Sequence, residues 1–216
     1  MKNELSEFLP AGAIDFIFPF LDSNNVHLKI TRQRASKHGD YRPPIGYPNH
    51  RISINGSLNP YSFLITLVHE MAHLETWKKN KSIREPHGRL WKTTFAAMMT
   101  PMLENDIFPP DLKQALLSHL KNPRASTGDR NLTVVLQRYD RKKSTLLQEI
   151  PINSLFALNG RVFRKLEKLR THYQCQCLNT KRMYRVNGLA EVAPVQETDK
   201  GIFTVVNNFN SVPVVF

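Results

Sequence analysis

The chain has 216 residues, of which 41% are hydrophobic, so it can bury a sizeable core and does not belong to the disordered class. It contains 30 Lys and Arg against 18 Asp and Glu, and the resulting formal net charge of +12 favours an anionic partner such as nucleic acid. No signal-peptide pattern and no apolar run long enough for a bilayer is visible, which predicts a cytoplasmic protein with no membrane-spanning part.

The first quarter of the chain predicts short helices followed by strands. Hydrophobic residues with helical spacing lie on both sides of Pro10, so one or two short helices are expected over residues 4–22. Residues 26–32 alternate between apolar and polar, as do residues 50–55, and both segments are predicted strands. Residues 35–50 are rich in glycine and proline, which predicts a loop.

The strongest predicted helix covers residues 60–79. Asn59 is a favourable N-cap, and Pro60 is favoured at the first helical position. Lys78 and Lys79 suit the negative end of the helix dipole in the last turn. The side chains expected to bury one side of this helix are Phe63, Leu64, Leu67, Val68, Met71, Ala72 and Leu74.

After a polar connection at residues 80–88, two more helices are expected at 89–104 and 110–121. Residues 122–131 are polar and poor in apolar side chains, which predicts a domain boundary. The pattern beyond it changes to short strands separated by turn signals, as in a small antiparallel sheet or barrel. These strands are expected at 132–139, 144–150, 162–169, 171–178, 182–186 and 202–206.

The sequence therefore predicts an α+β protein with two domains, residues 1–126 and 132–216. The first would hold the long helix, and the second would be a small, basic, all-β module.

The long helix contains the sequence His69-Glu70-Met71-Ala72-His73. Residues i and i+4 lie on one face of a helix, so the two histidines can hold one metal ion, for which zinc is the best match. The adjacent Glu70 is placed to act as general base on a zinc-bound water. Manganese, iron and nickel remain alternatives to zinc.

A catalytic zinc usually has three protein ligands, so a third is expected nearby. The candidates are Glu75, Glu85 and His87. Glu75 lies two residues after His73 and points away from the metal face of a helix. Glu85 and His87 both lie in the connection, which can fold back onto the helix, and the residues alone leave both open.

Together these residues resemble the SprT-like (Spartan-type) zinc metalloprotease family, which carries His-Glu-x-x-His and a downstream His-Gly-x-x-aromatic motif. The second motif corresponds here to His87-Gly88-Arg89-Leu90-Trp91. The resemblance covers roughly residues 20–105, including Gly39-Asp40-Tyr41-Arg42 and residues 50–55. It implies a zincin-like domain, zinc ligands at His69, His73 and His87, a catalytic base at Glu70, and cleavage of DNA-associated or DNA-crosslinked proteins.

Two features depart from that family. Many members add a zinc ribbon with four cysteines, whereas this chain has only Cys175 and Cys177. The sequence therefore predicts one zinc per chain and two buried, apolar cysteines, and one interpretation is a ribbon-like sheet that has lost its metal. The family motif also identifies no residue that stabilises the transition state; Tyr41, Tyr61 and Arg89 are the candidates.

The second domain carries a dense group of cations. With Phe163, Tyr173 and Tyr184 interleaved, they predict a sheet face that binds DNA phosphates and stacks bases. The alternative is an exposed strand edge on which Lys and Arg prevent aggregation. The cations are Arg161, Arg164, Lys165, Lys168, Arg170, Lys181, Arg182 and Arg185.

The function expected from the sequence is that of a zinc-dependent endopeptidase which the basic module brings to DNA. One alternative is a non-enzymatic nucleic-acid-binding protein with a structural zinc site, and another is a zinc hydrolase acting on a substrate other than a peptide. The sequence does not indicate an oligomeric state.

Overall fold

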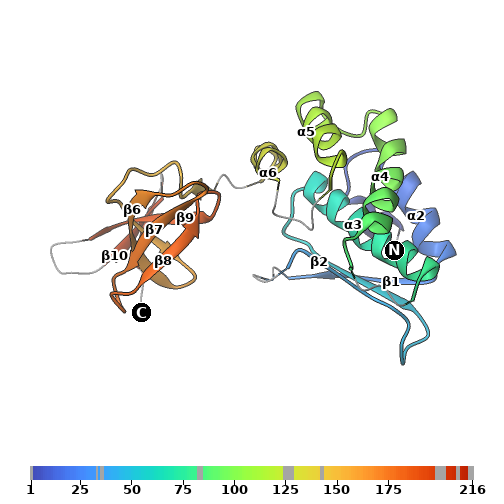
Figure 1. Ribbon diagram of the computed structural model, residues 1–216, viewed down its shortest axis with the longest axis horizontal. Helices are drawn as coiled ribbons and strands as arrows, with labels where there is room; N and C mark the ends of the chain where they lie inside the picture. Colours follow the sequence, from blue (N-terminus) through green and yellow to red (C-terminus); the bar gives the residue numbers. More distant parts are fainter. Residues whose placement is uncertain are drawn as a thin grey trace. The chain divides into compact units, whose positions relative to one another are not determined.

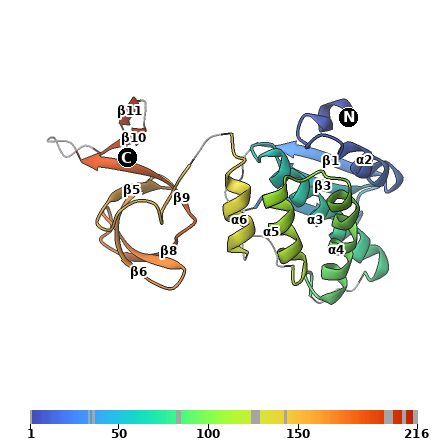
Figure 2. The same ribbon diagram turned by 90° about the horizontal axis from the view of Figure 1, so that it is seen from above.

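The computed structural model describes residues 2–32, 34, 37–81, 85–123, 129–141, 144–197, 203–207 and 210–213. These residues divide into two compact units, Met1–Arg141 and Lys142–Phe216. Six helices and two separate sheets confirm the α+β class (Figures 1 and 2). Among the described residues, no helix is both long and apolar enough to cross a membrane.

The described residues of unit 1 form six helices and a three-stranded sheet with the order β1-β3-β2. β1 (Val26–Thr31) pairs in parallel with β3 (His50–Asn55), and β2 (Gly39–Arg42) pairs antiparallel with β3. β2 lies within the segment that the sequence predicted to be a loop. The helices lie on one side of this sheet (Figure 1). They are α1 (Lys2–Ser6), α2 (Ile14–Ser23), α3 (Pro60–Lys79), α4 (Arg89–Glu104), α5 (Pro110–Leu120) and α6 (Arg130–Gln137).

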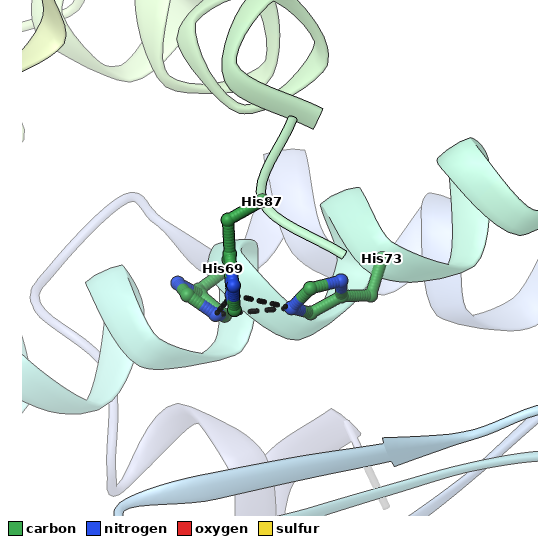
Figure 3. A group of neighbouring side chains, drawn as sticks. All are labelled: His69, His73 and His87. Carbon is green, nitrogen blue, oxygen red and sulfur yellow. Dashed lines mark hydrogen bonds between the residues drawn. The ribbon is translucent and has the colours of Figure 1, made fainter. Parts of the chain in front are cut away.

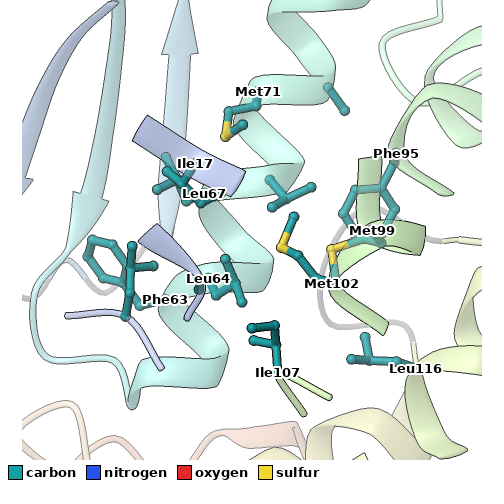
Figure 4. Close-up of a cluster of buried hydrophobic side chains, with 14 of the residues drawn as sticks. Ile17, Phe63, Leu64, Leu67, Met71, Phe95, Met99, Met102, Ile107 and Leu116 are labelled. Atoms are coloured by element: carbon teal, nitrogen blue, oxygen red, sulfur yellow. The ribbon is translucent and has the colours of Figure 1, made fainter. Parts of the chain in front are cut away.

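The core of unit 1 is built around α3. All seven side chains predicted to bury one side of this helix are at most 2% exposed. Figure 4 shows Ile17 of α2, Leu67 and Met71 of α3, and Phe95 and Met99 of α4 meeting in this core. Burial of such apolar area is the main stabilising term in folding. The core therefore fixes α3 between the sheet and α4.

Asn59 joins the start of α3 to the end of α6. Its side-chain oxygen accepts a hydrogen bond from the Ser62 amide at 2.8 Å, which is the predicted N-cap. Its side-chain nitrogen donates to the Leu136 carbonyl at 3.0 Å and to the Asp140 carboxylate at 2.6 Å. Asn59 is only 2% exposed, so water has little access to its side chain. If the side chain were removed, water could not easily replace its hydrogen bonds to these three partners.

The prediction of a strand at residues 132–139 is wrong, because Arg130–Gln137 is helix α6 of unit 1. The Asp129 side chain caps this helix by accepting from the amides of Asn131 and Leu132. Leu132 and Val135, three residues apart, are buried in the core of unit 1. A β-branched run thus becomes helical through its cap and its tertiary packing.

The division at 141/142 corrects the predicted domain boundary. The break falls after α6 rather than before it. Residues 124–128, in the predicted boundary segment, lie outside the described residues.

Unit 2 is an antiparallel sheet, as predicted, with the order β11-β10-β9-β5-β6-β7-β8 and with β4 paired to β9. Its strands curl around their own small core (Figure 2). The sequence did not predict β5, β9 or β11. The strands are β4 (Thr145–Leu146), β5 (Leu155–Leu158), β6 (Arg161–Lys168), β7 (His172–Cys177), β8 (Met183–Asn187), β9 (Glu191–Glu197), β10 (Phe203–Asn207) and β11 (Asn210–Pro213).

Cys175 and Cys177 are buried and unbridged on one side of β7, which confirms the prediction for these side chains. Lys165, which the sequence placed in the DNA-binding surface, is only 2% exposed. Its ammonium group donates to the carbonyls of Leu147 at 2.7 Å and Ile150 at 2.6 Å. Lys165 therefore serves the core of unit 2 and is not available to a phosphate.

The aromatic side chains of unit 2 are also placed differently from the prediction. Phe163 and Tyr173 are buried, and Tyr184 packs against the same core. In the strand register Arg164 pairs with Gln176, one residue away from the row that joins Phe163 to Cys177. Neighbouring residues on a strand point to opposite faces, so Arg164 lies on the face opposite these aromatic rings. A mixed face of cations and stacking aromatics is not formed by these residues.

Replacing Asn59 with alanine is expected to lower the free energy of unfolding of unit 1 by about 2 kcal/mol, because the helix cap and two buried hydrogen bonds are lost together. Urea unfolding followed by tryptophan fluorescence measures this unit, since both tryptophans, Trp77 and Trp91, belong to it. The exposed Asn3→Ala change is the matched control. Equal stability of the two variants would contradict the role assigned to Asn59.

Candidate metal centre

Three histidines converge on one point in unit 1. His69 and His73 lie one turn apart on α3, and His87 lies just before α4. Their Nε2 atoms form a nearly equilateral triangle, with separations of 3.1 Å (His69–His73), 3.0 Å (His73–His87) and 3.1 Å (His69–His87), as the dashed lines in Figure 3 show. The structure thus brings together the three residues that the sequence and the family resemblance selected.

This triangle fits a metal ion better than it fits mutual hydrogen bonds. A neutral imidazole carries one N–H, and a donor at one corner of such a triangle cannot point well at both other corners. A tetrahedral zinc ion about 2.0–2.1 Å from each nitrogen would need N–N separations of about 3.3 Å. The observed separations need to widen by only a few tenths of an ångström, so the three residues could hold a metal ion.

The protonation states also suit a cation. Burial, together with a smaller contribution from the neighbouring imidazoles, lowers the pKa of His69 to about 3. Burial likewise lowers the pKa of His73 to about 4 and lowers the pKa of His87. All three imidazoles are therefore neutral at pH 7, which leaves a nitrogen lone pair free to bind a metal.

Trp91 supports the triangle from α4. Its ring centroid lies 4.6 Å from that of His69, 5.5 Å from that of His73 and 4.7 Å from that of His87. Its indole N–H donates to the backbone carbonyl of His69 at 3.4 Å, and the side chain is 1% exposed. Trp91 also stacks on Phe95, with ring centroids 5.1 Å apart, which links the three histidines to the core. The sequence alone showed Trp91 only as the aromatic residue four positions after His87.

Glu70 is buried between α3 and the strand β2, with 7% of its surface exposed. A Cβ atom built on Gly39 would lie 2.5 Å from Glu70 Oε1 and 2.7 Å from Thr66 Cγ2, so only glycine allows β2 to come this close. The backbone N–H of Tyr41 donates a hydrogen bond to the Glu70 carboxylate. The role of Gly39 cannot be predicted from the sequence, because it depends on the contact of β2 with α3.

Burial, together with a smaller contribution from the negative charge of Asp40, raises the pKa of Glu70 from its ordinary 4.5 to about 8. The glutamate is therefore poised to hold a proton near neutral pH, which is the property of a general acid or base.

The other candidate ligands are not part of the triangle. Glu75 forms an ion pair with Lys78 at 2.9 Å. The Glu85 carbonyl accepts a hydrogen bond from the Gly88 amide at 3.0 Å and so shapes the turn that presents His87. Among the described residues, these two glutamates do not join the group of side chains able to hold a metal.

The three candidates for transition-state stabilisation have different surroundings. Tyr61 packs edge to face against Tyr139, with centroids 4.9 Å apart. Arg89 is exposed at the start of α4. Tyr41 is the candidate beside Glu70, and its hydroxyl lies 2.9 Å from Nδ1 of His50.

The purified chain is expected to contain one zinc ion, and His87→Ala is expected to lose most of it, because a bound ion would keep only two imidazole ligands. Metal analysis by mass spectrometry after dialysis measures both stoichiometries. The exposed His27→Ala change is the control and should keep the metal. Full zinc content in His87→Ala would contradict the assignment of this ligand, and two ions per wild-type chain would contradict the single site.

Glu70→Gln is expected to stabilise the metal-free protein at pH 8 but not at pH 4. The unfolded chain ionises this carboxyl near pH 4.5 and the folded chain near pH 8, so the folded state binds more protons between these values. Stability therefore falls as the pH rises through this window, by on the order of a few kcal/mol, and glutamine removes that dependence. Urea unfolding of chelator-treated protein tests this, with Glu75→Gln as the control. Parallel pH profiles for wild type and Glu70→Gln would rule out the raised pKa.

Comparisons with known proteins add no family assignment to this geometry. No family model matches the chain, and neither a curated protein nor a solved structure is significantly similar to it. The conclusions about this site therefore depend on its residues and their arrangement.

Proposed function

We propose that this protein is a zinc-dependent endopeptidase. The observation that carries the proposal is the position of Glu70, buried one residue from His69 in the helix that supplies two of the three converging imidazoles. Three protein ligands with a glutamate beside them are the composition of a catalytic zinc site. The resemblance of the same residues to the SprT-like metalloproteases supports this proposal.

Zinc bound by the three histidines would supply Lewis-acid activation of water and of a substrate carbonyl. Glu70 takes a proton from the attacking water and then passes it to the departing amine. The raised pKa of Glu70 suits the second step, because the glutamate must hold the proton between the two events. The contact with Gly39 and the hydrogen bond from Tyr41 keep the carboxylate in one place during both steps.

The strand β2 favours a peptide as the substrate. Among the described strands it lies at the edge of the sheet and pairs only with β3, and its residues Gly39 and Tyr41 contact Glu70. An extended peptide can add to such an edge as a further strand through main-chain hydrogen bonds. A peptide bound there would pass next to the general base.

Proteins associated with or crosslinked to DNA are the proposed substrates. The support is the net positive charge of the chain and the resemblance to the SprT-like family. In unit 2, Arg164 of β6 and Arg185 of β8 lie on the two strands that flank β7, on the face that the core does not use. Such cations can bind phosphates without any aromatic contribution.

A structural zinc site in a non-enzymatic DNA-binding protein is the weaker alternative. Structural zinc sites have four protein ligands, whereas the group within the described part of the chain has three. A structural zinc site also does not require a buried carboxyl with a raised pKa beside its ligands.

Glu70→Gln is expected to abolish peptide cleavage while zinc stays bound, with a loss in rate of at least about 10²-fold, because glutamine cannot accept the proton. Cleavage of a DNA-binding protein such as a histone, with and without DNA, measures the activity, and metal analysis measures the zinc. The control is Glu75→Gln, an equal change on the same helix at a residue paired with Lys78. Wild-type cleavage by Glu70→Gln would disprove the mechanism.

A further inference from the structure

One face of the unit 1 sheet packs against the helices, and the opposite face carries several cationic side chains. The register aligns His27, Arg51 and Arg42 in one row and Lys29, Ser53 and Asp40 in the next. The alternate residues of the same strands, among them Ile52 and Ile54, pack against the helices. Because side chains alternate along a strand, these two rows point away from the helices. We call this surface, with residues Arg34 and Lys37 of the preceding connection, the open sheet face.

The positive charge of unit 1 is concentrated in this segment. Residues 26–55 contain six Lys and Arg and one Asp, a net charge of +5. The rest of residues 1–141 contains 13 Lys and Arg and 12 Asp and Glu, so its charges nearly cancel. A separation of this kind within one domain creates a directed positive potential on the sheet rather than a uniformly basic surface.

Three cations near the open sheet face, Arg34, Lys37 and Arg42, are held in place by neighbouring residues. The Arg34 guanidinium donates to the Asn55 side chain at 2.8 Å and to the Ser53 hydroxyl at 3.0 Å. Asp40, the single acid of the segment, is shared by Lys37 at 2.7 Å and Arg42 at 2.9 Å. One carboxylate cannot neutralise two cations, and the Arg42 side chain remains 62% exposed. Fixed, exposed cations bind phosphates with little further loss of side-chain entropy.

An exposed aromatic ring lies at the same face. The Arg51 guanidinium carbon is 3.7 Å from the centroid of the Tyr47 ring, and Arg51 belongs to the outward row. Tyr47 is 57% exposed even though it stacks on this arginine. Its neighbour Ile45 is 73% exposed. An aromatic ring supported by arginine on one side and open to solvent otherwise is a suitable surface for stacking a nucleobase.

We propose that the open sheet face binds single-stranded nucleic acid, with the phosphates contacting Lys29, Arg42 and their neighbours and a base stacking on Tyr47. An acidic membrane fits this surface less well than a nucleic acid does. Membrane binding requires a sizeable apolar area to insert, and only Tyr47 and Ile45 would supply it beside an extended charged surface. An acidic protein would use the cations but would not require a base-stacking ring. This binding requires neither a metal ion nor Glu70, so it can be tested independently of the proposed peptidase activity.

Binding of a fluorescein-labelled oligothymidine to the full-length protein, measured by anisotropy over a range of salt concentrations, tests the proposal. Lys29→Gln combined with Arg42→Gln is expected to weaken binding on the order of tenfold at low salt. The slope of log K against log salt should fall in magnitude by about 1.4, since each lost phosphate contact contributes about 0.7 with single strands. The matched control is Lys79→Gln with Lys121→Gln, which removes the same charge from exposed helix ends and should bind like wild type.

Tyr47 provides a second, independent measurement. Tyr47→Ala is expected to weaken oligothymidine binding on the order of tenfold without changing the salt slope, whereas Tyr47→Phe keeps the ring and should bind like wild type. Binding should also persist in Glu70→Gln and after chelation.

Three outcomes would overturn the proposal. The first is wild-type affinity in the Lys29/Arg42 variant together with lost binding in Arg164→Gln/Arg185→Gln, which would place binding in unit 2. The second is equal weakening by the Lys79/Lys121 control, which would show a net-charge effect only. The third is binding to vesicles of anionic lipid without binding to the oligonucleotide.

Discussion

The arrangement of the candidate site depends on one contact, that of the two-histidine face of α3 with the chain just before α4. His69 and His73 reach the same point because they lie one helical turn apart, but His87 reaches it only because α4 packs along α3. Trp91 makes this packing specific, since it contacts all three imidazoles and continues into the core through Phe95. The hydrophobic core of unit 1 therefore also positions the three candidate metal ligands.

The same helix has a second constraint where it faces β2. Glu70 points at β2 rather than at solvent, and β2 can approach because residue 39 is glycine. The approach removes water from the carboxyl, which raises its pKa, and it brings the edge strand of the described sheet beside the proposed general base. One close contact thus connects the acid–base chemistry of Glu70 with the surface on which an extended peptide would lie.

The surface distribution of positive charge in the two units cannot be predicted from the composition alone. In unit 2, Lys165 is enclosed by carbonyl groups and the aromatic rings fill the core, so fewer cations reach the surface than the sequence suggests. In unit 1, the cations of three adjacent strands gather on the face that the helices leave open. Two proposed activities, peptide cleavage and nucleic-acid binding, would then use the β2 edge and the open face of the same small sheet.

The sequence by itself determined the elements whose signals are local. The bounds of α3 follow from Asn59, Pro60 and the terminal lysines, and its buried face follows from helical periodicity. The i, i+4 spacing also placed His69 and His73 on one face, and the family resemblance, rather than spacing, selected His87 over Glu85. Periodicity failed at α6, where a β-branched run is read as a strand unless the cap at Asp129 and the packing of Leu132 are known.

Only the tertiary structure decided which side chains share an environment. The closeness of Gly39 to Glu70, the burial of Lys165 and the alignment of cations across β1, β3 and β2 all join residues that are distant in sequence. These features arise from strand register and from helix–sheet packing, which depend on the whole core being formed. A local pattern cannot encode them, because the same residues in a different register would point to the opposite face.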